Sequence, residues 1–354
     1  MIPRLYEKTE TAFTGFGICP LSDVISCFVT EERNGEYFLE MEYPREGHLA
    51  TSLIIDRIIL ADPCDNATEP EPFRISKVNY DMVGVINVYA EHVSYQLNNI
   101  LVPRFSSTVS TPAAAWTAAV ANVYNTNPFT FSSDITGGAS RTFGAETAVS
   151  IRDLLGGMEG SFLDSFGGEF FWNRYTVNLL SSRGADNGVK IAYTKNLTGL
   201  NYEIDMSEVY TAAVAFWLNE GTYKSSNLQT FANNYAYDHA IVLDASGDFD
   251  SEPTRADLNA YALAQLTQTA ADPMLSLEVS FVPLWQTEEY KDFYGLEHVS
   301  LCDTVTVLYP PLNLDIKAKV VRTVYNVLAD RYSELSISSV RSSLADTIYS
   351  LMKA

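Results

Sequence analysis

Short strand-like segments separated by turn signals dominate the first hundred residues of this chain. Residues 37–43 (YFLEMEY) alternate loosely between apolar and polar side chains, and the favoured turn pair Asn34-Gly35 stands just before them. Residues 24–43 are therefore predicted to form a hairpin, with a first strand near 24–29. Further strands are predicted at 53–60, 73–80 and 83–90, and a proline-rich loop at 62–72. Five or more short strands in about 90 residues predict a small β-barrel or sandwich.

Helical signals appear between strands in the next hundred residues. Thr111 and Pro112 precede an alanine-rich stretch, which predicts a helix with Thr111 as its N-cap. A second helix is predicted over 150–156, with Ser150 as cap and the acidic Asp153 in its first turn. Strand structure is predicted at 169–180, followed by a turn at 183–188 and a return strand at 189–193.

Strand character returns from about residue 202. Residues 210–218 (YTAAVAFWL) form an apolar run long enough for a strand buried on both faces. A helix is predicted after Pro253, because apolar residues recur there at helical spacing; they are Leu258, Tyr261, Ala262 and Leu266. Strands are predicted at 275–282, 304–309 and 316–326. An amphipathic helix is predicted at 343–352, with Leu344, Ile348 and Leu351 on one side.

These segments predict an α+β protein that is mainly β, with two β-barrel modules flanking an α/β module. The expected boundaries are 1–100 for the first barrel, 101–204 for the α/β domain, 205–338 for the second barrel and 339–354 for a C-terminal helix. A helical insertion is expected at about 245–272 within the second barrel. Two β modules of similar size suggest a duplicated barrel, although the two show no sequence self-similarity.

The charge of the chain limits its possible partners. It carries 44 acidic and 23 basic residues, a formal net charge of −21. A groove that grips nucleic acid needs the opposite balance, because phosphate neutralisation supplies most of the binding energy. The acidic surplus favours solubility, or a protein that lets DNA pass without holding it. No apolar run approaches the roughly 18 residues of a membrane span, and the N-terminus lacks an apolar signal core, so secretion is not expected.

Cysteine and histidine spacing gives no sign of a metal site or a disulfide framework. The four cysteines are Cys19, Cys27, Cys64 and Cys302, and none forms a Cys-x-x-Cys pair. Cys19 and Cys27 are close enough to meet across a hairpin, but buried free thiols are the simpler expectation. We therefore expect reduced cysteines, no metal and no cofactor.

Three carboxylates in a glycine-rich segment carry the clearest enzyme hypothesis. Glu159, Asp164 and Glu169 lie within 156–169, and paired carboxylates are the acid and base of glycoside hydrolysis. Acidic residues are common throughout this chain, however, so surface or turn roles explain them as well. The glycines are equally explained by tight turns.

Nucleophilic catalysis has weaker support. Gly160-Ser161 lacks the Gly-x-Ser-x-Gly spacing and has no histidine nearby. Cys302 and His298 are four residues apart, but a packed thiol beside a surface histidine is the ordinary arrangement. No Walker-type loop and no His-Glu-x-x-His motif occurs. No catalytic, cofactor-binding or metal-binding residue is therefore assigned, and the chain is not expected to be an enzyme.

Several segments, in order along the chain, resemble one family, the prophage endopeptidase tail proteins of long-tailed phages, also called tail-associated proteins. These segments are EERNGEYFLEMEYP at 31–44, AEHVSYQL at 90–97, GGEF at 167–170, RGADNGVKIAYTKNL at 183–197, LCDTVTV at 301–307, KVVRTVYNVLADRY at 319–332 and SLADTI at 343–348. Thr194 stands where a glycine is more usual in the family, which bears only on the local turn.

The resemblance implies a hub-type fold like the baseplate hub of contractile-tailed phages. Two related β-barrels per chain would flank an α/β region, and three chains would form a ring of six barrels. The implied role is a tail-tip hub that links the tail tube to the host-facing tip and lets DNA pass. The alternatives are a receptor- or saccharide-binding tail module, and a cell-wall hydrolase that uses Glu159, Asp164 and Glu169.

The resemblance also implies partners and a location. A homotrimer would contact the distal tail or tail tube proteins, the tape measure protein, and tail fibre or receptor-binding proteins. DNA would pass without specific binding, and no membrane span is expected. The protein would be made in the host cytoplasm and reside at the tail tip of the virion. No residue matches a peptidase role, so lytic activity is expected only in partners or in additional C-terminal domains.

Overall fold

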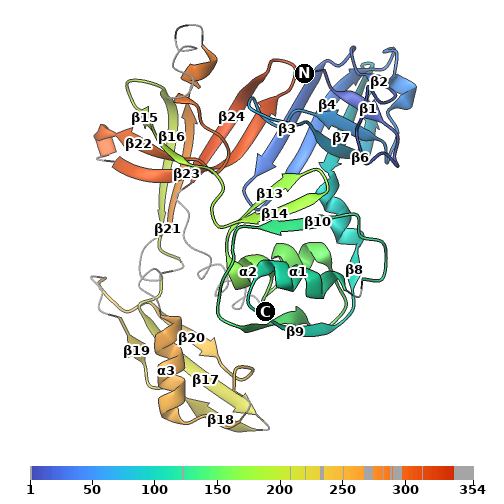
Figure 1. The fold of residues 1–354 in the computed structure, drawn as a ribbon. Coiled ribbons are helices and arrows are strands. Elements are labelled where there is room, and N and C mark those ends of the chain that lie inside the picture. The colour runs from blue at the N-terminus through green and yellow to red at the C-terminus, as the bar shows by residue number, and fades with distance from the viewer. Residues whose placement is uncertain are drawn as a thin grey trace. The chain divides into compact units, whose positions relative to one another are not determined.

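The structure is a computed structural model (Figure 1). It describes residues 2–121, 123–207, 209–219, 221–231, 235–249, 251–266, 274–281, 283–287, 289, 297–312 and 314–338. The chain divides into two compact units. The first unit contains residues 1–200 and 278–338, and the second contains 201–277. The helix predicted at 339–354 lies outside the described residues.

One large sheet dominates the first unit. Its strand order is β15-β22-β23-β3-β4-β7-β6-β5-β1-β2, and β24 pairs with β23 beside this path. The strands are β1 (Arg4–Tyr6), β2 (Cys19–Pro20), β3 (Ser26–Glu32), β4 (Tyr37–Pro44), β5 (Ile58–Ala61), β6 (Glu71–Tyr80), β7 (Val85–His92), β15 (Asp186–Ala192), β22 (Thr304–Tyr309), β23 (Leu314–Asn326) and β24 (Arg331–Ser338). Short helices η1 (Ala50–Ser52), η2 (Val93–Asn99), η5 (Leu284–Gln286) and η7 (Pro310–Leu312) connect parts of this unit.

The predicted N-terminal hairpin is confirmed as β3 and β4. Asn34 adopts a left-handed backbone conformation (φ 56°) in the turn, which asparagine tolerates better than most residues. In β4, alternate residues from Tyr37 to Tyr43 are buried, because successive side chains of a strand point to opposite faces. The hairpin therefore presents one apolar face to the core.

Strands from the N-terminal and C-terminal segments of the unit join in the middle of the sheet. β23 pairs antiparallel with β3, so that Thr323 lies opposite Glu31 and Tyr325 opposite Val29. β23 also pairs antiparallel with β22 and with β24. The N-terminal and C-terminal β segments are thus hydrogen-bonded to each other rather than only connected through the chain.

The segment between them contains short strands and helices. Its elements are β8 (Leu101–Val102), β9 (Phe105–Val109), α1 (Pro112–Val120), β10 (Thr130–Ser133), β11 (Arg141–Ala145), β12 (Val149–Ser150), the π-helix η3 (Asp153–Gly157), α2 (Phe162–Phe166), β13 (Glu169–Asn173) and β14 (Thr176–Leu180). Thr111 caps α1 by accepting from the N–H of Ala114, as predicted. Ser150 and Asp153 exchange hydrogen bonds at the start of the predicted second helix. Packed aromatic rings form the core here, including Phe143 against Phe162 at 4.9 Å.

The second unit is a small sheet with one helix against it. Its elements are β17 (Ala212–Asn219), β18 (Thr222–Ser225), β19 (Gln229–Thr230), β20 (Ala240–Asp244) and α3 (Arg255–Gln265). β17 pairs with all three other strands, and Thr254 caps α3 in a reciprocal capping box with Asp257. β16 (Leu197–Asp205) and β21 (Met274–Phe281) pair where the chain enters and leaves the unit.

The mainly β character predicted from the sequence is confirmed. Closed barrels are not seen in the described residues, where the large sheet runs as an open path from β15 to β2. The predicted hairpin of 169–180 with 189–193 is wrong: β14 pairs with β13 and, in parallel, with β10, while β15 pairs in parallel with β22. The expected domain boundaries at 100, 204 and 338 stay a prediction.

Candidate functional site

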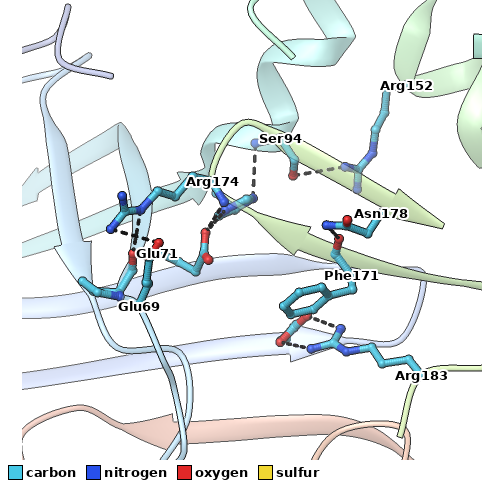
Figure 2. A network of polar contacts seen from close by, with 11 residues as sticks. Glu69, Glu71, Ser94, Arg152, Phe171, Arg174, Asn178 and Arg183 are labelled. Carbon is cyan, nitrogen blue, oxygen red and sulfur yellow. Dashed lines mark hydrogen bonds and ion pairs between the residues drawn. The ribbon is translucent and has the colours of Figure 1, made fainter. Parts of the chain in front are cut away.

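A network of charged and polar side chains joins parts of the first unit that are far apart in the sequence (Figure 2). Its members come from the β3–β4 hairpin, from β6, β7 and η2, from the start of η3, from the β13–β14 hairpin and the residues after it, and from β23. Most of these side chains are largely buried, and a buried charge is costly unless it is paired. The partners of each charged side chain therefore show which strands and loops the network connects.

Glu31 on β3 and Arg183, which follows β14, form a bidentate ion pair. The two terminal guanidinium nitrogens lie 2.5 and 3.1 Å from the carboxylate oxygens, and the guanidinium lies over the ring of Phe171 at 5.0 Å. Burial by itself would lower the pKa of Arg183, but the charge and hydrogen bonds of Glu31 outweigh burial and raise it. Arg183 therefore stays charged and ties the chain after β14 to the N-terminal hairpin.

Glu169, the first residue of β13, receives three interactions next to this pair. Its Oε1 lies 2.7 Å from Nζ of Lys319 on β23 and 3.3 Å from Arg33 in the β3–β4 turn. Its Oε2 accepts the backbone N–H of Arg183 at 2.6 Å. This buried carboxylate thus connects the N-terminal hairpin, the β13–β14 hairpin and the C-terminal strand β23.

Glu71 and His92 form a second buried pair, on β6 and at the end of β7. Nε2 of His92 lies 3.1 Å from Oε2 of Glu71, which also accepts the N–H of Arg174 at 2.7 Å. Nδ1 of His92 accepts the N–H of Ser94, so the neutral ring carries its proton on Nε2 and donates it to Glu71. Burial raises the pKa of Glu71 to about 8 and lowers the pKa of His92 to about 3. At neutral pH the pair is therefore a hydrogen bond between uncharged groups.

Arg152 lies between two aromatic rings in the same network. Its guanidinium lies 4.6 Å from the ring centre of Tyr95 and 5.0 Å from that of Trp172. It also donates to Oγ of Ser94 and to the carbonyl of Gly35, each at 3.3 Å. Cation–π contacts and neutral acceptors hold this charge, and burial lowers its pKa.

The carboxylates of the hydrolase hypothesis lie in three different environments. Glu159 is exposed. Asp164 is exposed, lies in the first turn of α2 and accepts the backbone N–H of Gly160 at 2.8 Å. Glu169 is buried and engaged by Lys319 and Arg33. A retaining or inverting glycosidase needs two carboxyl groups facing one substrate, and the environments of these three do not provide that.

The proposed thiol–histidine pair also has other partners. Nε2 of His298 lies 2.9 Å from Oδ1 of Asp65, which belongs to the loop after β5. Cys302 is buried and has a left-handed backbone (φ 71°), and burial raises the pKa of its thiol to about 12. A nucleophilic cysteine needs a lowered pKa, so Cys302 is suited to packing. All four cysteines are free thiols.

The residues that the structure describes contain no group of three or more histidine, cysteine, aspartate or glutamate side chains placed to hold a metal ion. Among the same residues, no helix is long and apolar enough to cross a membrane.

The residues of this network were not predicted as a site, although one signal for them was present. Glu31 follows Cys27 and Val29 at intervals of two in β3, and all three are buried. A charged residue at an inward-facing position of a strand requires a partner in the interior. The sequence alone does not identify that partner, because Arg183 is 152 residues away.

The fold and the network define a mainly β protein whose N-terminal and C-terminal β segments are joined in one sheet through β3 and β23. Comparison with known families gives the class: residues 185–348 match the family described as Prophage endopeptidase tail. The resemblance predicted from the sequence is thereby confirmed. A search of curated proteins found no match.

Solved structures with the same fold include prophage tail proteins. The prophage tail protein gp18 from Listeria monocytogenes EGD-e has a TM-score of 0.60 and 12% identity, over 100% of this chain and 99% of that one. The 43 kDa tail protein of prophage MuSo2 from Shewanella oneidensis has a TM-score of 0.59 and 10% identity, over 91% and 95%. A chain of a PdpA–VgrG complex has a TM-score of 0.51 and 8% identity, over 90% and 60%. At these identities the likeness establishes a shared fold.

Proposed function

We propose that this chain is a structural hub protein at the tip of a phage or prophage tail. The observation that carries the proposal is the match of the complete fold, end to end, to a prophage tail protein. The family match over 185–348 supports the same role independently, because it rests on sequence. In this role the protein links the tail tube to the host-facing tip as part of the virion, after synthesis in the host cytoplasm.

The proposed hub is a homotrimeric ring. The two ends of the large sheet, β1 to β7 and β22 to β24 with β15, correspond in this proposal to the two barrel modules of a hub. Their direct pairing through β3 and β23 gives each subunit a continuous β wall, which suits a closed ring of identical copies. Partners would be tail tube proteins and the tape measure protein on one side, and fibre or receptor-binding proteins on the other.

The acidic charge of −21 suits a ring through which DNA moves. Negative side chains facing the lumen repel phosphate and leave no site where DNA is held. The proposal therefore requires acidic residues to predominate on the lumen of the assembled ring. A basic lumen in a map of the assembly would contradict it.

The structure favours a scaffold over a wall hydrolase. The carboxylate that is central to the hydrolase hypothesis, Glu169, is held by Lys319 and Arg33 and by the N–H of Arg183. The word endopeptidase belongs to the description of the family, and we do not extend that activity to this chain.

Electron microscopy of the purified protein, combined with light scattering, tests the hub role. The expected result is a three-fold ring with a central pore and a mass of three chains, at least when the tail tube protein is added. A particle that stays monomeric with tube protein present, and that binds whole host cells by itself, would instead support a receptor-binding module. Loss of wall-degrading activity in Glu169→Gln would support the hydrolase.

A further inference from the structure

Two Asn-Gly pairs occur in this chain, Asn34-Gly35 and Asn187-Gly188. In such a pair the backbone nitrogen of the glycine can attack the side-chain amide carbon of the asparagine, because glycine has no side chain to hinder the approach. The attack requires an asparagine side chain that can rotate and a backbone that can adjust. The surroundings of each pair therefore decide which of the two reacts in the folded protein.

Asn34 is held at both ends of its side-chain amide. Its Nδ2 donates to the carbonyl of Gly168 at 3.1 Å, and its Oδ1 accepts the N–H of Phe170 at 2.7 Å. The attacking nitrogen of this pair is also engaged, because the N–H of Gly35 donates to the carbonyl of Glu32 at 3.1 Å. Both reacting groups are thus fixed by hydrogen bonds in the β3–β4 turn.

Asn187 lies in an irregular and exposed part of β15. The register between β15 and β22 shifts between Asp186 and Lys190, so that Asn187 and Gly188 fall in the interval without a paired residue on β22. Both residues are exposed, and the space around the Cβ position of Gly188 is open. Within the part of the chain that the structure describes, no group forms a hydrogen bond with the side-chain amide of Asn187.

One hydrogen bond engages the attacking nitrogen of this second pair. The N–H of Gly188 donates to Oδ1 of Asp186 at 3.1 Å, and Oδ2 of the same carboxylate lies 2.5 Å from Nζ of Lys317. Both contacts are exposed, so water can replace them at little cost in free energy. The nitrogen of Gly188 is therefore less constrained than the nitrogen of Gly35.

We propose that Asn187 is the residue at which this protein deamidates in its folded state, and that the fold protects Asn34. The nitrogen of Gly188 forms a bond to Cγ of Asn187, its proton passes to the departing amide nitrogen, and ammonia leaves. Water then opens the succinimide ring. Cleavage of the new N–Cγ bond gives aspartate, and cleavage of the original peptide C–N bond gives isoaspartate.

The surroundings of Asn187 can accept either product. Isoaspartate adds one atom to the backbone, and here that atom falls within a register shift that already interrupts the pairing of β15. β15 is also the first strand in the order of the large sheet and pairs only with β22 among the described strands. Each modified copy therefore gains one negative charge next to Asp186 and stays folded.

Peptide mapping by mass spectrometry tests the proposal on the full chain. The folded protein and the same protein unfolded in guanidinium chloride are kept at one neutral pH, and conversion of amide to acid is followed at both asparagines. In the folded protein Asn187 should convert at least about ten times faster than Asn34, a ratio equivalent to about 1.4 kcal/mol. In the unfolded protein the two rates should be similar, because the hydrogen bonds of Asn34 are absent.

Matched variants separate side-chain freedom from other causes. Asn187→Gln lengthens the side chain, so that attack would have to form a larger ring, and the acidic species of the folded protein should disappear. Asn187→Asp has the aspartate product in place and should keep the urea midpoint of the parent. Asn34→Asp should lower that midpoint, because a carboxylate cannot donate to the carbonyl of Gly168.

Three results would count against the proposal. Equal rates at the two asparagines of the folded protein, or faster conversion of Asn34, would overturn it. A folded protein in which neither residue converts, while both convert in guanidinium chloride, would overturn it as well. A lower urea midpoint for Asn187→Asp would contradict the conclusion that the modified protein stays folded.

Discussion

Glu31 and Arg183 form a bidentate, largely buried ion pair. Removing one partner would leave the charge of the other buried without a counter-charge. Glu31→Gln should lower the free energy of unfolding by about 3–5 kcal/mol, as expected when a buried pair is broken from one side. Urea denaturation measures the change. The matched control is Glu146→Gln, which breaks a pair with Arg104 in which both side chains are mostly exposed. The free energy of unfolding of the control should equal that of the parent. Equal losses in both variants would show that the Glu31 pair stabilises the fold no more than an exposed pair does.

The pair of Glu71 and His92 predicts how stability depends on pH. In the folded chain the pKa of Glu71 is raised to about 8, from an ordinary 4.5, mainly by burial. Between these values the folded state holds a proton that the unfolded state has lost. The contribution of Glu71 to stability is therefore full below pH 4.5 and is lost as pH rises toward 8.

Glu71→Gln removes this dependence and keeps a hydrogen-bond acceptor for His92 and for the N–H of Arg174. Relative to the parent, the variant should gain stability progressively from pH 5 to pH 8, by a few kcal/mol at most. His92 provides an internal reference, because its pKa is lowered to about 3 by burial. It costs stability as pH falls below 6.5 in both proteins. A difference between parent and variant that stays constant from pH 5 to pH 8 would show that the pKa of Glu71 is not raised in the folded chain.

At the scale of elements, the turn between β14 and β15 requires glycine at position 184, both for its backbone conformation and for the space that a side chain would occupy. Gly184 has a left-handed backbone (φ 84°), and an added Cβ would overlap the backbone of Cys302 and Asp303. Gly188 has a similar φ of 73° but open space around the Cβ position. Gly188→Ala should therefore cost about 1–2 kcal/mol for the backbone conformation alone.

Gly184→Ala should cost about 1–3 kcal/mol more than Gly188→Ala, because it adds overpacking to the same backbone strain. Thermal and urea unfolding of both variants measure the difference. Equal costs would show that the close approach between the turn and Cys302 is easily relieved.

Local patterns predicted elements well and their partners poorly. The β3–β4 hairpin, the strand at β22 and the capped helix α1 follow from alternation, turn residues and Thr111, all of which act over a few residues. The strand at β15 was also predicted, but its partner was not. β14 precedes β15 directly, yet β15 pairs with β22 more than 100 residues later. Pairing between distant strands depends on which apolar faces meet, and local sequence patterns do not show which faces those are.

The candidate site shows the same limit. An acidic residue at the inward position of Glu31 signals a buried partner, and no local feature selects Arg183 for that role. Glu169 was singled out for a different reason, as a member of a carboxylate cluster. Its actual partners, Lys319 and Arg33, come from opposite ends of the chain.

For the whole molecule, the pairing of β3 with β23 predicts that the first unit unfolds cooperatively. Its two segments are nevertheless separated in the sequence by 77 residues of the second unit, 201–277. Thr323→Pro removes a backbone N–H in the middle of β23, where Thr323 lies opposite Glu31 on one side and Leu335 on the other. Hydrogen exchange should then show loss of protection in β3 and β4 as well as in β22 and β24. Protection of β17 and α3 should remain.

Val214→Pro in β17 is the reciprocal variant. It should remove protection from the second unit and leave β3, β4 and β23 unchanged, because β17 pairs only with β18, β19 and β20 among the described strands. If Thr323→Pro loosened β22 to β24 alone, the N-terminal and C-terminal β segments would be independent domains that merely touch. The hub role proposed above requires the opposite result, because a subunit that carries force in a tail would otherwise come apart between β3 and β23.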